Sequence, residues 1–261
     1  MTEVVIVEGQ EAAGTLVAAN ILALIRAKPD AVLGLATGST PLVVYRSLAA
    51  QLAPGGVDVS RVRGFALDEY VGLPPGHPES YRAVISREIV GPLGLTPELI
   101  NVPDGSLEGI ATAGDHYERA IIAAGGVDLQ VLGIGTDGHI GFNEPGSSLA
   151  SLTRVKTLTQ QTRRDNARFF ASETDVPLHC ITQGLGTILR AHHLVLLAFG
   201  ASKAKALAGA VEGPVSSSNP GSAIQLHPHV TVLADEAAAS QLALCDYYRF
   251  AWANKPAWQG I

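Results

Sequence analysis

The sequence is poor in charged residues, and its few charges lean to one sign. Asp, Glu, Lys and Arg make up 16% of the 261 residues, against about 25% in a typical soluble domain. Hydrophobic residues, at 47%, are ordinary, so the deficit falls on the surface, as it would in a homo-oligomer. The formal net charge of -6 argues against a nucleic-acid partner, which needs a basic field.

Cysteines and long apolar runs are also scarce. Cys180 and Cys245 show neither metal-ligand spacing nor a disulfide framework, which favours a reducing compartment. The first nine residues have no cationic region of the kind that opens a signal peptide. The longest apolar run, near 194–199, is far too short to cross a bilayer. We therefore expect a cytoplasmic protein with no membrane partner.

Apolar runs typical of buried strands alternate with helical patterns along the whole chain. The strand-like runs are 4–7, 31–36, 62–67, 127–132, 194–199 and 229–233. Helical patterns cover 13–25, 108–124, 201–211 and 235–248, and a further helix is expected to open at Pro41. This alternation predicts a single doubly wound α/β domain over 1–261, with a mostly parallel sheet between helices in a Rossmann-like arrangement. The stretch 216–221 is expected to be a loop within that domain.

Ligands of such folds bind where strands end and loops lead into helices. The first of these loops, Thr37, Gly38, Ser39 and Thr40, lies between a predicted strand and a predicted helix. Small residues at a helix N-terminus let backbone N–H groups reach an anion, which favours phosphate binding. A capped helix start is the alternative. The loop is no Walker motif, because the lysine of that motif is missing.

Asp68 follows the predicted strand 62–67 and should point into the ligand crevice. An isolated Asp is often a turn or helix cap. The next residues, 71–75, form a stiff loop that begins no helix, however, so function is favoured.

A glycine-rich segment at 133–139 formally matches the dinucleotide fingerprint. Gly141, Asn143 and Pro145 would interrupt the helix that this fingerprint requires, and no acid occurs between Glu144 and Asp165 for a ribose. What remains is a turn that carries Asp137 and His139, with Glu144 five residues later. Carboxylates beside an imidazole tune it for proton transfer near neutral pH.

A metal site is not expected, because Asp137 and His139 offer two ligands and no further His or Cys cluster has suitable spacing. The histidines at 192–193 and at 227 and 229 are expected to serve structure or solvent. Lys203 stands at a predicted helix start, where a cation is unfavourable unless an anion lies nearby. Lys203 and one arginine of the crowded segment 163–168 are therefore expected to clamp a phosphate.

Four segments together resemble the glucosamine-6-phosphate deaminase family. They are Leu-Asp-Glu-Tyr-Val-Gly-Leu-Pro at 67–74, His-Pro-Glu-Ser-Tyr at 77–81, Asp-Gly-His-Ile-Gly-Phe-Asn-Glu-Pro at 137–145 and Thr-Arg-Val-Lys-Thr-Leu-Thr at 153–159. The resemblance extends over about 35–236. It implies conversion of D-glucosamine 6-phosphate and water to D-fructose 6-phosphate and ammonium, without metal or cofactor.

The resemblance also implies roles for single residues. His139 would open the pyranose ring with support from Asp137 and Glu144, and Asp68 would move a proton between C2 and C1. The implied phosphate contacts are Thr37, Gly38, Ser39, Thr40, Arg168 and Lys203. A lid over the active site would lie near 158–181.

Regulated members of this family bind N-acetylglucosamine 6-phosphate between subunits, and four residues match that site: Ser147, Arg154, Lys156 and Thr157. The segment 246–250 does not align with the tyrosine that those members use, so regulation and oligomeric state stay open. Galactosamine 6-phosphate is another substrate to consider. The alternatives are a 6-phosphogluconolactonase, which shares an Asp-Gly-His segment, and a non-catalytic sugar-phosphate sensor. Ammonium release from glucosamine 6-phosphate separates these possibilities.

Overall fold

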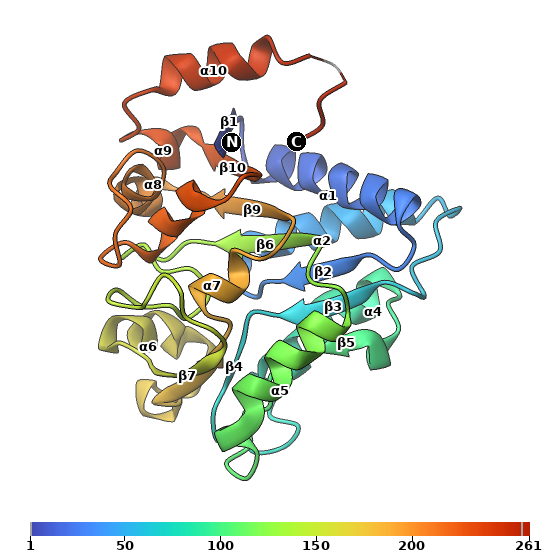
Figure 1. Cartoon of the computed structure of the whole chain (residues 1–261), viewed down its shortest axis with the longest axis vertical. Helices are drawn as coiled ribbons and strands as arrows, with labels where there is room; N and C mark the ends of the chain where they lie inside the picture. Colours follow the sequence, from blue (N-terminus) through green and yellow to red (C-terminus); the bar gives the residue numbers. More distant parts are fainter. Residues whose placement is uncertain (1, 257) are drawn as a thin grey trace.

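A seven-stranded sheet forms the centre of the computed structural model, which describes residues 2–256 and 258–261 (Figure 1). Every neighbouring pair of strands is parallel. The strands, in sheet order, are β1 (Thr2–Val7), β10 (Val230–Asp235), β9 (His193–Ala198), β6 (Leu129–Gly133), β2 (Val32–Leu35), β3 (Arg63–Ala66) and β5 (Ile100–Asn101). The six predicted strands are all present, and β5 is additional.

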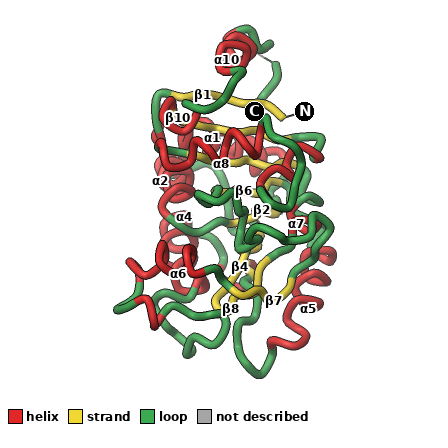
Figure 2. The backbone as a smooth tube through the Cα atoms, turned by 90° about the vertical axis from the view of Figure 1, so that its left-hand side faces the viewer, coloured by secondary structure: helices red, strands yellow, loops and turns green. Residues whose placement is uncertain are grey.

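Helices pack on both faces of this sheet, and β2 and β9 are therefore buried along their whole length. Figure 2 shows α2 (Ser39–Leu52) and α4 (Gly91–Leu93) on one side of the strands, and α5 (Ile110–Ala123) and α7 (Leu185–Ile188) on the other. The predicted doubly wound fold is therefore confirmed. The other α-helices are α1 (Gln10–Ala27), α3 (Tyr81–Ile85), α6 (Gln160–Asn166), α8 (Ala204–Val211), α9 (Glu236–Ala239) and α10 (Cys245–Ala253).

A second sheet was not predicted. It is antiparallel and contains β4 (Asp68–Tyr70), β8 (His179–Thr182) and β7 (Arg154–Thr157), in that order. Asp68 pairs with Thr182, so it begins a short strand instead of lying in a loop. These strands are only three or four residues long. They lack the long apolar runs from which the parallel strands were predicted.

Two predicted helix limits are also corrected. The helix expected over 235–248 is broken into α9 and α10, because the carboxylate of Glu212 accepts hydrogen bonds from the N–H groups of Ala243 and Leu244 and holds the intervening turn. The helix expected to open at Pro41 begins at Ser39. Pro41 then lies in the first turn, where its missing N–H breaks no helical hydrogen bond.

Short helical turns connect the main elements. They are 3₁₀ turns at Pro97–Leu99, Ala167–Phe169, Glu173–Asp175, Ala201–Lys203 and Pro220–Leu226, and a π-helical turn at Ser86–Val90. Within the described part of the chain, no helix combines the length and the apolar character needed to span a membrane.

Candidate active site

The predicted site residues follow four strands that are adjacent in the sheet, β9, β6, β2 and β3. The loop 37–40 follows β2, Asp68 follows β3, the turn 134–139 follows β6, and Lys203 follows β9. Parallel strands end at one edge of the sheet, so the four segments meet there. Ligands bind at this edge in doubly wound folds.

Two glycines of the turn after β6 allow the backbone to hold His139 in place. Gly138 has φ of +89°, a conformation that favours glycine. A Cβ atom on Gly135 would overlap the ring of His139, so only a glycine lets the imidazole lie against the backbone there. The N–H of His139 donates to Oδ1 of Asp137 at 3.1 Å. The segment that resembles a dinucleotide fingerprint therefore holds an imidazole.

Two carboxylates flank this imidazole. Nδ1 of His139 lies 2.8 Å from Oδ1 of Asp137 and 3.6 Å from Oε2 of Glu144. The closer contact is poorly aligned with the ring N–H, so it is an ion pair more than a hydrogen bond. Burial lowers the pKa of His139, but Asp137 and Glu144 outweigh burial and raise that pKa to about 9. Burial raises the pKa of Asp137, and His139 outweighs it to bring that pKa to about 2.

Glu144 is buried and bound to the start of α6. Its Oε1 accepts a hydrogen bond of 2.6 Å from the hydroxyl of Thr162 and a longer one of 3.3 Å from the N–H of Thr159. Thr159 in turn caps α6, because its side chain accepts from the N–H of Thr162. The sequence analysis missed both threonines, although a Thr three residues before another polar residue is a capping signal.

Asp68 is buried, and burial followed by the negative charge of Glu69 raises its pKa to about 8. The charge on His139 and the N–H of Phe142 oppose this shift. Asp68 is therefore close enough to His139 and its loop to interact electrostatically with them. Glu69, which the sequence analysis did not single out, is also buried and accepts from the N–H groups of Tyr81 and Arg82.

The loop after β2 offers an open helix N-terminus. Gly38 precedes α2 with φ of +95°, and Ser39 is the first helical residue. A Cβ atom on Gly38 would have open space around it, with no described atom within 4 Å beyond its chain neighbours. Burial raises the pKa of Tyr81 well above its ordinary value, and the nearby side chain of Thr37 opposes this shift. Thr40 lies in the first turn of α2 and is half-buried.

Lys203 and Arg168 lie near each other at this edge. Burial lowers the pKa of Lys203, Asp165 and Asp137 oppose this, and the positive charge of Arg168 adds to the lowering. Arg168 stacks its guanidinium on Phe169 at 4.7 Å. Arg163, in contrast, donates to the carbonyl oxygens of Val176 and Glu173. The structure thus brings together one of the three crowded arginines and Lys203, as an anion clamp requires.

The four residues that match a regulatory site do not share one surface. Ser147 is buried and donates to the carbonyl of Glu144, while Arg154 donates to Oδ1 of Asn143 at 2.8 Å. Alternation along β7 places Lys156 on the face of Arg154 and Thr157 on the opposite face, where its hydroxyl lies 3.3 Å from Nδ1 of His179.

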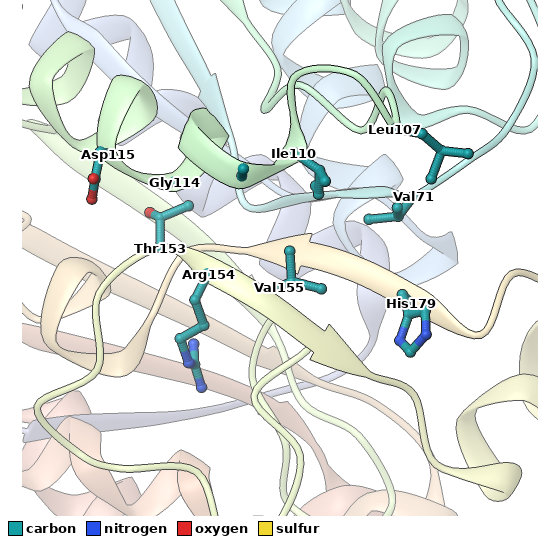
Figure 3. A pocket seen from close by; sticks show the side chains of 10 residues that line it. Val71, Leu107, Ile110, Gly114, Asp115, Thr153, Arg154, Val155 and His179 are labelled. Carbon is teal, nitrogen blue, oxygen red and sulfur yellow. The ribbon is translucent and has the colours of Figure 1, made fainter.

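A cavity of about 490 Å³ lies between α5 and β7. Its lining includes Val71, Leu107, Ile110 and His179. Figure 3 shows the guanidinium of Arg154 turned away from Leu107 and Ile110. Arg154 also lines this cavity, but its guanidinium donates to Asn143 and so lies toward the loop that carries Asn143.

Asp137, His139 and Glu144 are also spaced so that one ligand atom from each lies within 4.8 Å of the others. Such a trio has the composition of a divalent-metal site. A metal needs a neutral imidazole, however, and a proton competes for His139 because its pKa is about 9. The expectation that the site uses no metal stays a prediction.

Known proteins are similar to this chain in both sequence and fold. A family model described as glucosamine-6-phosphate isomerases/6-phosphogluconolactonase matches residues 8–233. Proteins named glucosamine-6-phosphate deaminase are 60% identical in Bifidobacterium longum, over 100% of both chains, and 62% identical in Arthrobacter sp., over 99% of this chain and 100% of the relative.

Solved structures of known proteins have a similar fold. A monomeric glucosamine-6-phosphate deaminase has a TM-score of 0.89 at 39% identity, over 92% of this chain and 99% of its own. The 6-phosphogluconolactonase of Thermotoga maritima has a TM-score of 0.71 at 21% identity, over 90% of this chain and 99% of its own, which shows the fold alone. From the matched family model and the full-length relatives it follows that the chain belongs to the family of glucosamine-6-phosphate isomerases and 6-phosphogluconolactonases.

Proposed function

We propose that the chain is a cytoplasmic enzyme that converts D-glucosamine 6-phosphate and water to D-fructose 6-phosphate and ammonium. Relatives about 60% identical over their full length carry the name of this activity, whereas the lactonase of Thermotoga maritima is 21% identical to the chain. The observation that carries the proposal is the pairing of buried Asp68 with charged His139. They follow strands on either side of β2, whose loop offers a helix N-terminus to the phosphate.

Ring opening needs a proton on the ring oxygen as the bond from C1 to that oxygen breaks. His139 is protonated at neutral pH, because its pKa is about 9, and it supplies this proton. The neutral imidazole that results takes up the proton that the C1 hydroxyl loses as C1 becomes the aldehyde. Asp137 and Glu144 stabilise the imidazolium before and after this exchange.

Isomerisation needs a base over carbon. Ionised Asp68 takes the proton from C2 while protonated His139 gives a proton to the C1 oxygen, and the product is an enolamine. Asp68 then delivers its proton to C1, which leaves an iminium at C2. Water adds to C2 and gives up one proton to His139, and ammonia then leaves to give the ketone. A carboxylate whose pKa is about 8 is a stronger base than an ordinary one, and the substrate's ammonium group favours its ionised form. Every proton transfer in this sequence uses groups of the chain itself, so it calls for no cofactor.

The phosphate binds to Thr37, Gly38, Ser39 and Thr40 at the start of α2 and to the cations of Lys203 and Arg168. Backbone N–H groups at a helix start and two nearby cations are a usual phosphate site. The segment 158–181 carries Arg168, so phosphate binding would draw it over the sugar as a lid on a single-domain enzyme. Ser147, Arg154, Lys156 and Thr157 remain candidates for a regulatory site in a homo-oligomer.

The Asp68→Asn variant tests the proposal. Asparagine keeps the shape of the side chain but cannot accept the C2 proton, so we expect turnover to fall roughly 100- to 10,000-fold with KM close to wild type. Ammonium and fructose 6-phosphate are measured with glucosamine 6-phosphate as substrate. Near-normal deamination by the variant would exclude Asp68 as the base.

The wild-type protein separates the other possibilities in the same assay. A lactonase would open 6-phosphogluconolactone and release no ammonium. A sensor would bind glucosamine 6-phosphate without consuming it. Galactosamine 6-phosphate, supplied in parallel, shows whether the site distinguishes the two amino sugars.

A further inference from the structure

The loop 216–221 contacts both segments that surround the imidazole. The N–H of Gly221 donates to the carbonyl of Gly138 at 2.7 Å, in the turn of His139. The carbonyl of Ser217 accepts from the N–H of Gly146 at 2.7 Å, two residues after Glu144. This loop, to which the sequence analysis gave no function, is therefore attached at one point to the turn of His139, here called the catalytic turn, and at another to the chain just after Glu144.

The side chain of Asn219 fills the space between two glycines. A Cβ atom on Gly138 would overlap its Oδ1, and a Cβ atom on Gly209 would overlap its Nδ2. Nδ2 donates to the carbonyl of Ala206 at 3.0 Å. Oδ1 is buried and accepts no hydrogen bond from the residues that the structure describes. One amide group thus spans from α8 to the catalytic turn.

These two glycines lie in the two elements that carry Lys203 and His139. Gly209 lies in α8, which begins directly after Lys203. Gly138 lies between Asp137 and His139. In a bound sugar phosphate, the phosphate at Lys203 and the ring oxygen at His139 are held apart by a fixed length of substrate. Small errors in such a spacing lower the rate strongly, because reacting groups must meet within a few tenths of an ångström.

We propose that Asn219 is a positioning residue that sets the distance between Lys203, which binds the phosphate, and His139, which acts as the acid–base group. The inference rests on the proposed deaminase function. The amide acts as a spacer of defined length: α8 is bonded to one end, and the backbone of the catalytic turn packs on the other. It does not touch the substrate.

A double-mutant cycle between positions 219 and 209 tests this spacer. We expect Asn219→Ala to lower kcat for glucosamine 6-phosphate by about 10- to 100-fold, while inorganic phosphate still protects the protein against thermal unfolding as it does the wild type. Gly209→Ala drives a methyl group into Nδ2 of Asn219 and should lower kcat in the wild-type background. In the Asn219→Ala background its clash partner is gone, so it should cost little more.

The outcomes separate a spacer from ordinary packing. A lower melting temperature with unchanged kcat in Asn219→Ala would overturn the inference, and so would additive losses in the double variant. Ser218→Ala, in the same loop but exposed, is the matched control and should keep wild-type kcat. If the wild-type protein releases no ammonium, the proposed function itself fails, and the inference fails with it. If the wild type is active and Asn219→Ala equals it, only the inference fails.

Discussion

Two histidine sites lie at opposite edges of the same sheet, and one imidazole is positively charged whereas the other is neutral. His139 follows the carboxyl end of β6, and its pKa is raised to about 9. His193 begins β9, stacks on His229 with ring centroids 3.7 Å apart, and has its pKa lowered to about 3. Both rings are largely buried, and burial alone would lower the pKa of each.

The neighbours of each ring account for the difference. His139 faces two carboxylates, whose negative charge stabilises its proton. His193 faces the rings of His229 and His227 and the cation of Lys255, all of which disfavour a proton, and its Nε2 lies 2.9 Å from the hydroxyl of Thr231. The chain thus keeps a charged imidazole where a substrate can reach it and a neutral one where the strands begin.

Removal of the charged imidazole should have the largest effect on activity. We expect His139→Gln to lower kcat for ammonium release roughly 100- to 10,000-fold, because the ring oxygen loses its proton donor. His193→Gln is the matched control, since it removes the other histidine of the comparison and should keep most of the activity at pH 8. Similar losses in both variants would mean that the two sites do not differ in role.

Removing one carboxylate should make His139 more like His193. In Asp137→Asn the pKa of His139 falls, because a large part of the negative charge beside the ring is lost. Protonated His139 is the active form, so activity disappears as pH rises through its pKa, and the alkaline limb of the kcat/KM profile should move to lower pH. We expect kcat to fall about tenfold as well. An alkaline limb that stays in place would assign it to another group.

The smallest expected effect concerns stability at the neutral site. The pKa of His193 is about 3 in the folded chain and near 6.5 when unfolded, so the unfolded state binds more protons below about pH 6.5. The contribution of neutral His193 to the free energy of unfolding is complete above that pH and is lost progressively as the pH falls toward 3. We expect the melting temperature to drop by a few °C between pH 7.5 and 5, and to drop less in His193→Gln. An equal slope in both proteins would place the acid sensitivity elsewhere.

Sequence reasoning succeeded where one stretch of chain carries the whole signal. The buried runs that became β2, β6 and β9 are continuous and apolar, and the polar residues that follow them were expected at the ligand edge. Asp68 and His139 were predicted as site residues in this way.

What escaped prediction depends on distant segments meeting. The strand of Asp68 exists only because it pairs with β8. Glu69 is engaged by N–H groups of Tyr81 and Arg82, and Gly135 makes room for an imidazole that folds back on it. Nor could the spacing of Asp137, His139 and Glu144 within 4.8 Å be read from the sequence, since it follows from how the loop returns.

The pairing of Asp68 with Thr182 has a consequence for how the enzyme matures. More than 100 residues separate the two partners, whereas β2 and β3 pair across a much shorter stretch of chain. Closing a long loop costs entropy and slows folding. During synthesis Asp68 cannot be fixed in place until most of the polypeptide has been made. In refolding, ammonium release should accordingly return no earlier than the circular-dichroism signal of the parallel sheet and its helices.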